Sequence, residues 1–179
     1  MKALDKHSIR QMIKQKRLSL DQKTLLTYSQ QIINKVLLHP QYLKSKCIGI
    51  YVSLPQEVNT FSLIEQALQS KIVCTPKIED GKMNFYQIRS LNDLKEGHFH
   101  VLEPTTSLFV KPQEIDCMIV PMVAYDHYNY RVGYGKGYYD KYFKEDFYGY
   151  KLGIAFDFQR VDKIDVDQYD VQLDEIITK

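Results

Sequence analysis

The sequence predicts an α/β fold, a three-layer α/β/α single domain whose largely parallel central sheet carries helices on both faces. Short apolar runs bounded by proline or polar residues alternate with segments of helical periodicity, which is typical of layered α/β folds. A length of 179 residues allows one hydrophobic core and is short for two ordinary domains, so we expect one domain over residues 1–179. The sequence shows no internal repeat and no low-complexity segment.

Apolar spacing and turn residues define the elements expected in the first half of the chain. Ile9 and Ile13 lie on one helical face, and Ser19 followed three residues later by glutamine fits a capping box. Proline cannot donate to a sheet ladder, so we expect one strand to stop at Pro76. The expected helices cover residues 4–17, Ser19 to about 39, and Asn59 or Thr60 to about 68, and the expected strands cover residues 47–52, 72–75 and 82–88.

The second half begins with a segment that has no clear period. Residues 89–115 contain one glycine and two prolines, so we expect a connecting loop that closes over a ligand. The elements expected after it are a buried strand over residues 117–120 that ends at Pro121, a helix from Gly137 to about 144, and strands over residues 152–156 and 173–178. Alternation of strands and helices thus continues to the end of the sequence.

Composition excludes several classes of protein. The 24 basic and 22 acidic residues give a net charge of +2, without the basic excess typical of nucleic-acid-binding proteins. No run approaches the ~18 apolar residues that span a bilayer, and the first residues lack the apolar core of a signal peptide, so we expect a cytoplasmic protein. Cys47, Cys74 and Cys117 each lie in an apolar, strand-like run, so we expect small core residues rather than nucleophiles or metal ligands.

We expect the chemistry at residues 117–140, where three of the eight glycines fall within five positions. Gly133, Gly135 and Gly137 follow a buried strand and a polar loop. Glycines spaced in this way let backbone N–H groups converge on an anion, and a helix is expected directly after them. Three close glycines also occur in flexible surface loops, and the spacing matches neither a P-loop nor the dinucleotide-binding fingerprint. The order of strand, loop, glycines and helix favours a phosphate site.

Charged residues flank the glycines, and one more follows another strand. Arg131 and Lys136 can neutralise phosphate oxygens, and Asp140 could hold a divalent cation. Glu57 comes just after the first predicted strand, and ligands of open α/β sheets bind beyond the carboxyl ends of the strands. The alternative for Glu57 is a surface glutamate near a helix N-terminus, where the helix dipole favours a negative charge.

The first predicted helix carries a stripe of cations. Lys6, Arg10 and Lys14 are four residues apart, so they lie on one face of that helix. Such a stripe is most often a solvated surface. The functional alternative is that Lys6 and Arg10 reach over the glycine loop to a nucleotide.

At these positions the chain resembles the 5-formyltetrahydrofolate cyclo-ligase family, also called methenyltetrahydrofolate synthetases. The matching motifs are Arg131 to Asp140 (Arg-Val-Gly-Tyr-Gly-Lys-Gly-Tyr-Tyr-Asp), Lys6 to Arg10, and residues 51–53 with 57–60. The resemblance covers nearly the whole chain, and its central motif is specific. Asn129 stands where the family commonly has glycine, and asparagine tolerates a positive φ better than most residues.

The resemblance implies an ATP- and Mg²⁺-dependent enzyme that converts 5-formyltetrahydrofolate to 5,10-methenyltetrahydrofolate, with release of ADP and phosphate through a phosphorylated formyl (iminium phosphate) intermediate. It implies ATP binding by Lys6, Arg10, Arg131, Gly133, Tyr134, Gly135, Lys136, Gly137, Tyr138 and Tyr139. It implies folate binding by Val52, Glu57, Tyr134, Gly135, Lys136, Gly137 and Tyr138. It implies magnesium binding by Asp140 and Asp170. We expect Lys136 and Arg131 to be the catalytic residues, with Lys136 closest to the chemistry.

The expected partner is a small-molecule folate, with or without a polyglutamate tail. We expect no nucleic acid, no membrane, and a monomer or weak homodimer. Two alternatives stay open. The first is a sugar-phosphate isomerase-like enzyme on a related fold, which needs no ATP and so leaves Lys6 and Arg10 dispensable. The second is a non-enzymatic RNA-binding module whose tyrosines stack on bases, against which the near-neutral charge argues.

Overall fold

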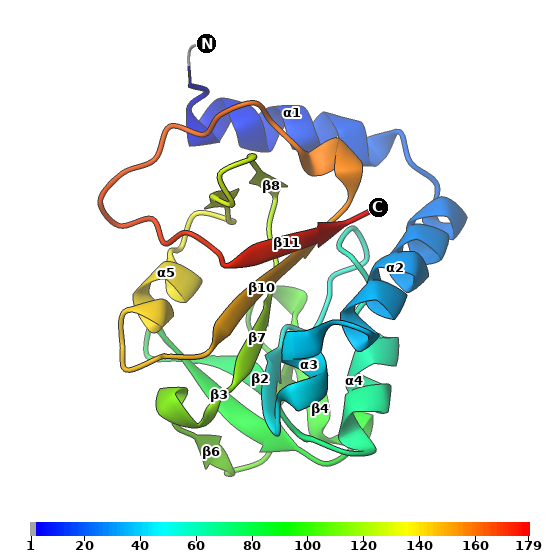
Figure 1. Ribbon diagram of the computed structural model, residues 1–179, viewed down its shortest axis with the longest axis vertical. Helices are drawn as coiled ribbons and strands as arrows, with labels where there is room; N and C mark the ends of the chain where they lie inside the picture. Colours follow the sequence, from blue (N-terminus) through cyan, green and yellow to red (C-terminus); the bar gives the residue numbers. More distant parts are fainter. Residues whose placement is uncertain (1–2) are drawn as a thin grey trace.

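The computed structural model describes residues 3–179, and a seven-stranded sheet of order β11-β10-β7-β1-β2-β3-β6 forms its centre (Figure 1). Its strands are β1 (Cys47–Ile50), β2 (Ile72–Glu79), β3 (Lys82–Ile88), β6 (Phe109–Val110), β7 (Cys117–Val120), β10 (Tyr150–Ala155) and β11 (Glu175–Thr178). Neighbouring strands from β11 to β2 are parallel, and β3 and β6 are antiparallel additions at one edge. The predicted α/β class with a largely parallel sheet is confirmed, and the single domain over residues 1–179 stays a prediction.

Helices cover the two faces of the sheet unequally (Figure 1). One face packs against α2 (Gln22–Leu37), α3 (Pro40–Lys44) and α4 (Phe61–Leu68). The other face packs against the short α5 (Tyr138–Phe143), and α1 (Lys6–Leu18) crosses one end of the molecule. Within residues 3–179, no helix is both long and apolar enough to span a bilayer.

Alternation along the strands divides the core into two layers. Ile48 and Ile50 of β1 face α2 and α4, whereas Cys47 faces the layer that contains α5. Gly49 lies on that second face, where an added Cβ would stand 2.8 Å from the sulfur of Met118 on β7. The three cysteines are buried and free, as predicted for core residues.

The strand order reverses between β1 and β7. From β1 the chain crosses through α4 to β2 on one side, and it later returns through β7 and continues outward through β10 and β11 on the other side. At such a switch point the connections leave the sheet in opposite directions, so a crevice opens beyond the carboxyl ends of the two strands. The loops that follow β1 and β7 therefore line one crevice.

The predicted helix ends are partly wrong. The capping box at Ser19 does not form, because Ser19 ends α1, and Asp21 caps α2 by accepting a hydrogen bond from the backbone N–H of Thr24. Helix α1 begins one residue after Asp5, whose side chain accepts from the N–H of Ser8. Helix α3 was not predicted, since its five residues are too few to show a period.

The strand predicted to stop before Pro76 continues to the end of β2. Parallel pairing with β1 reaches only Cys74, so the rest of β2 has an open edge on that side. Along its other edge β2 stays paired with β3, where Pro76 lies opposite Phe85. A proline on an open edge removes no ladder hydrogen bond, so the strand tolerates it.

The prediction that residues 89–115 form only a connecting loop is also wrong. This segment contains an antiparallel hairpin of β4 (Leu94–Glu96) and β5 (Leu102–Pro104), and its later part supplies the edge strand β6. Strands of two or three residues are too short to give a period of two, so the sequence pattern could not reveal them.

A second small hairpin, β8 (Ala124–Tyr125) with β9 (Arg131–Val132), leads into the glycines. The buried carboxylate of Asp126 holds its turn by accepting hydrogen bonds from the backbone N–H groups of Tyr128, Tyr130 and Ile164, at 3.0 to 3.1 Å. Asn129 in the turn has φ +61°, the conformation expected for it from the sequence. The turn sets the direction in which the chain enters the glycine loop.

We predict that Asp126→Ala lowers the free energy of unfolding by roughly 3 kcal/mol, because one buried and two partly buried N–H donors lose their charged acceptor. Urea unfolding followed by circular dichroism would measure this change. Asp162→Ala is the matched control, since Asp162 is exposed on the segment that packs beside the same turn. Equal stability of the two variants would contradict the role given to Asp126.

Candidate active site

A cleft of about 670 Å³ opens beyond the carboxyl ends of β1 and β7. Its lining comes from the face of α1, the loop after β1, strands β2 and β3, the β4–β5 hairpin, the chain from Pro121 through the glycine loop to α5, and residues 167–170. Every residue predicted from the sequence to bind a nucleotide, folate or metal lies in this lining. The structure thus brings together residues that are up to 164 positions apart in the chain.

The glycine loop needs glycine at two of its three positions. Gly135 has φ +102° and Gly137 has φ +68°, conformations that side chains with a Cβ rarely adopt. A Cβ at Gly135 would stand 3.6 Å from the guanidinium carbon of Arg10, which is ordinary van der Waals contact, so the backbone conformation and not the space requires glycine there. Gly137 is the N-cap of α5, as predicted.

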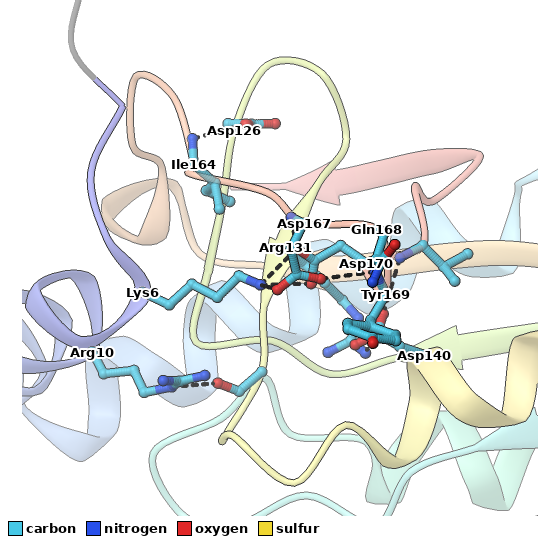
Figure 2. A network of polar contacts seen from close by, with 12 residues as sticks. Lys6, Arg10, Asp126, Arg131, Asp140, Ile164, Asp167, Gln168, Tyr169 and Asp170 are labelled. Atoms are coloured by element: carbon cyan, nitrogen blue, oxygen red, sulfur yellow. Dashed lines mark hydrogen bonds and ion pairs between the residues drawn. The ribbon is translucent and has the colours of Figure 1, made fainter.

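The cations of α1 do reach over this loop. Arg10 donates from Nε to the carbonyl of Gly133 at 2.8 Å, and Lys6 extends across the cleft to the segment 167–170 (Figure 2). Contact of Lys6 and Arg10 with a nucleotide stays a prediction, and Lys14, the third residue of the stripe, is exposed to solvent. After Arg10, the face of α1 that is turned toward the site continues through Ile13 and Arg17 rather than Lys14, because an α-helix has 3.6 residues per turn.

Lys6 is paired with two carboxylates. Its Nζ lies 2.6 Å from Asp170 and 3.2 Å from Asp167, and the N–H of Asp167 also donates to the Asp170 carboxylate (Figure 2). Burial by itself would lower the pKa of Lys6, but the hydrogen bonds from Lys6 to the two aspartates outweigh this effect and raise the pKa. Lys6 is therefore a fixed positive charge at one side of the cleft.

Arg131 is a buried cation at the floor of the site. Its Nη2 lies 3.5 Å from Asp140, and its guanidinium packs on the ring of Tyr139 at 5.4 Å. Burial lowers the pKa of Arg131, and Asp140 opposes this effect. Within residues 3–179, the buried Nε of Arg131 has no hydrogen-bond partner, which leaves a donor for an anionic ligand.

Asp140 and Asp170 are the carboxylates available to a metal ion. Both line the cleft, and both act electrostatically on the guanidinium of Arg131, of which Asp140 is the ion-pair partner. In the part of the chain that the structure describes, no group of three or more metal-binding side chains occurs. Mg²⁺ at nucleotide sites commonly uses one or two carboxylates together with phosphate oxygens and water, so this pair fits such an ion.

Glu57 lies inside the cleft wall with only 7% of its surface exposed, so the surface alternative is wrong. One carboxylate oxygen accepts from the N–H of Leu54 and the other from the hydroxyl of Tyr134, both at 2.7 Å. Burial raises the pKa of Glu57, although these hydrogen bonds and the nearby charge of Arg17 partly oppose the shift. The site therefore holds a desolvated carboxylate in one orientation.

The hairpin tip and the glycine loop meet across the cleft. The ammonium group of Lys136 stands 5.8 Å from the ring centre of Phe99, and Lys136 forms no ion pair with any residue from 3 to 179. His98 pairs at 3.4 Å with Glu103, a buried carboxylate that also accepts from the N–H of Ile78. Lys136 is thus a cation at the cleft without a carboxylate partner.

Several residues of the cleft were not predicted. Tyr51, His98, Phe99 and Glu103 line it, and Arg17 contacts the Glu57–Tyr134 pair from outside. The histidine, the phenylalanine and the glutamate lie in residues 89–115, which the sequence predicts to close over a ligand, but no pattern in that segment singles out individual residues. Arg17 had one weak signal, since positions 6, 10, 13 and 17 share one face of a helix.

Comparisons with known proteins agree with this geometry. The sequence model of the 5-formyltetrahydrofolate cyclo-ligase family matches residues 2–179. The 5-formyltetrahydrofolate cyclo-ligase of Mycoplasma pneumoniae is 30% identical over 97% of this chain and 98% of its own length. The NMR structure of Aquifex aeolicus 5,10-methenyltetrahydrofolate synthetase has a TM-score of 0.88 and 32% identity, covering 97% of this chain and 89% of that chain. A structure of the 5,10-methenyltetrahydrofolate synthetase from Mycoplasma pneumoniae has a TM-score of 0.79 and 30% identity, covering 97% and 98%.

The raised pKa of Glu57 predicts a pH-dependent effect on stability. The folded state binds this proton more tightly than the unfolded state, whose glutamate pKa is about 4.3. The stability of the wild-type protein therefore falls as the pH rises from the unfolded pKa through the folded pKa. Glu57→Gln does not titrate, so its free energy of unfolding relative to wild type should increase over that pH window.

Urea unfolding from about pH 4 to pH 8 would measure this difference. Glu65→Gln, at an exposed glutamate of α4, is the control for general pH effects. A stability difference between Glu57→Gln and wild type that stays constant across the window would contradict the prediction.

Proposed function

Because the chain belongs to the 5-formyltetrahydrofolate cyclo-ligase family and is therefore an enzyme, we propose that it converts 5-formyltetrahydrofolate to 5,10-methenyltetrahydrofolate with ATP and Mg²⁺, releasing ADP and phosphate. One observation carries the proposal: the cations of α1, the glycine loop and the buried Glu57 converge on a single cleft. A cleft of about 670 Å³ is also in the size range of small-molecule sites. No feature of the cleft favours the isomerase or RNA-binding alternatives over this reaction.

The chemical difficulty of the reaction is a poor leaving group on a poor electrophile. The formamide oxygen leaves badly, and the amide nitrogen donates into the formyl carbon. Transfer of the γ-phosphoryl group to that oxygen breaks the bond between phosphorus and the ADP oxygen and forms an iminium phosphate. N10 of the folate then attacks the carbon and loses its proton, and the C–O bond breaks to release phosphate. Such transfers depend on positioning and charge stabilisation, so no covalent nucleophile is required.

Lys136 and Arg131 would stabilise the charge that develops during transfer. Lys136 has no carboxylate partner among the described residues, so its charge is available to the transferring group. Arg131 offers its unpaired Nε from a buried position, where a low local dielectric strengthens its interaction with an anion. Preorganised cations of this kind lower the barrier because they need no reorganisation during the reaction.

Lys6, Arg10 and the glycine loop would hold the nucleotide phosphates. In the free protein Lys6 is paired with Asp170, and Arg131 lies against Asp140. Nucleotide binding would give each of these cations a phosphate partner and release the carboxylates. Mg²⁺ held between Asp140, Asp170 and the phosphates would neutralise charge on the transferring group.

Folate would occupy the other half of the cleft, against Val52, Glu57 and residues 134–138. The buried carboxylate of Glu57 suits the N–H donors of the pterin ring, since a desolvated acceptor forms strong hydrogen bonds. Tyrosine rings of the loop offer apolar faces to the planar ring system. We further propose a cytoplasmic monomer or weak homodimer that takes folates with or without a polyglutamate tail and binds neither nucleic acid nor membranes.

The first test is direct turnover. Incubation of the purified protein with 5-formyltetrahydrofolate and Mg²⁺ should produce the near-ultraviolet absorbance of the methenyl product only when ATP is added. Removal of the metal with EDTA should abolish the band, and excess Mg²⁺ should restore it. Folded, ATP-binding protein that gives no band would refute the proposed reaction.

We predict that the two halves of the cleft have separate roles, one in phosphoryl transfer and one in folate binding. Lys136→Ala should lower kcat by roughly 10²-fold or more with little change in folate binding, because it removes charge stabilisation in the transition state. Glu57→Ala should weaken folate binding while ATP still binds. Lys111→Ala, at an exposed lysine outside the cleft lining, is the control.

Steady-state kinetics with either substrate varied, together with calorimetric titration of ATP, would measure these effects. An equal loss of ATP binding in Lys136→Ala and Glu57→Ala would rule out this division of roles.

A further inference from the structure

Arg17 is a cation that supports the cleft without lining it. Its Nη1 lies 3.3 Å from the hydroxyl oxygen of Tyr134, and its Nη2 donates to the carbonyl of Met122 at the same distance. The Met122 carbonyl also accepts from the buried side-chain amide of Gln159 at 2.8 Å, so this anchor is part of the packed core. Nη2 of the guanidinium is therefore anchored to the core, and Nη1 points toward the Tyr134 hydroxyl.

The two hydrogen bonds that link Arg17 through Tyr134 to Glu57 both run in the same direction, from donor to acceptor. Arginine can only donate, so the Tyr134 oxygen accepts from Arg17. The Tyr134 hydroxyl then donates its single hydrogen to Glu57 at 2.7 Å. A cation at one end and a carboxylate at the other polarise the hydroxyl between them, which strengthens both hydrogen bonds. The chain fixes one oxygen of Glu57, and the N–H of Leu54 fixes the other.

Arg17 is also the one charged neighbour of Glu57 among residues 3–179. The groups that act on Glu57 are Arg17 from α1, Tyr134 from the glycine loop, Tyr51 from the end of β1 and Tyr139 from α5. Burial raises the pKa of each of the three tyrosines, so all three are neutral at physiological pH. Among the described residues, Arg17 is thus the one charge that helps to keep the buried carboxylate ionised, in addition to the hydrogen bonds from the N–H of Leu54 and the hydroxyl of Tyr134.

We propose that Arg17 is a positioning residue for the folate half of the site, which acts through the Tyr134 hydroxyl to hold Glu57 ionised and correctly oriented for the N–H donors of the pterin. The inference rests on the proposed binding of folate by Glu57. It assigns α1 a second task, since Lys6 and Arg10 of the same helix face the nucleotide half. One helix face would thus support both substrates and fix the two halves of the cleft relative to each other.

The test compares Arg17→Gln, Arg17→Lys and Lys14→Gln with the wild-type enzyme. Lys14 is exposed on the same helix and forms no hydrogen bond or ion pair with residues 3–179, so it controls for the loss of one α1 cation. Arg17→Gln should raise the KM for 5-formyltetrahydrofolate, and its dissociation constant measured by calorimetry without ATP, by about tenfold. The KM for ATP should stay unchanged, and Arg17→Lys should recover part of the folate affinity because it keeps the charge.

The pH profile separates a positioning role from a structural one. Without the Arg17 cation the pKa of Glu57 rises further, so the acid limb of kcat/KM for folate should move to higher pH in Arg17→Gln and much less in Arg17→Lys. Arg17→Gln should also have little further effect on folate affinity in a Tyr134→Phe background, where the chain is already broken.

Several results would overturn the inference. These are an unchanged folate dissociation constant in Arg17→Gln, equal weakening of folate and ATP, additive effects of Arg17→Gln and Tyr134→Phe, or an unmoved acid limb. If Arg17→Gln does not fold, Arg17→Lys still decides, because it must weaken folate binding and leave ATP binding unchanged. Failure of the proposed function would look different, since the wild-type enzyme itself would then form no methenyl product.

Discussion

Reversal of the strand order between β1 and β7 is the constraint on which the site depends. The connections from the two strands leave the sheet in opposite directions, so a crevice opens that no side chain of the sheet fills. The loop after β1 delivers Glu57 to one wall, and the chain after β7 delivers the glycine loop to the other. Helix α1 crosses one end of the molecule (Figure 1), and its Lys6 and Arg10 complete the cleft lining. The position of each functional group follows from this topology, and the local sequence decides only which group stands there.

Charge balance is the second feature that organises the cleft. Three of its cations are satisfied in the free protein, Lys6 by Asp170, Arg131 by Asp140, and Arg10 by the Gly133 carbonyl (Figure 2). Pairing keeps buried charges from standing alone, which would be costly in the low dielectric of the interior. In the proposed function, phosphates and metal would therefore exchange partners with groups already in place. Such an exchange would favour the joint binding of nucleotide and metal over either one alone.

The sequence predicted those parts of the site whose signals are local. Gly135 was identified because glycine spacing is visible within five positions, and its φ of +102° confirms the need for glycine. Ser19 and Asp21 are both good caps two residues apart, so only the structure decides between them. The course of β2 past Pro76 depends on where its neighbour β1 ends. Arg17 could not be assigned, because its partner Tyr134 is 117 positions away and becomes a neighbour only through folding.

In the proposed function, the short glycine loop would couple the two substrates. Tyr134, whose hydroxyl is bound to Glu57, is two residues before Lys136, whose ammonium is free of carboxylates among the described residues. Consecutive Cα atoms are about 3.8 Å apart, so the two Cα atoms lie within about 7 Å of each other. A folate held at the first residue and a phosphate held at the second would therefore be bound by neighbouring parts of one loop. Direct transfer between bound substrates needs such proximity, which one loop would supply without a separate closing domain.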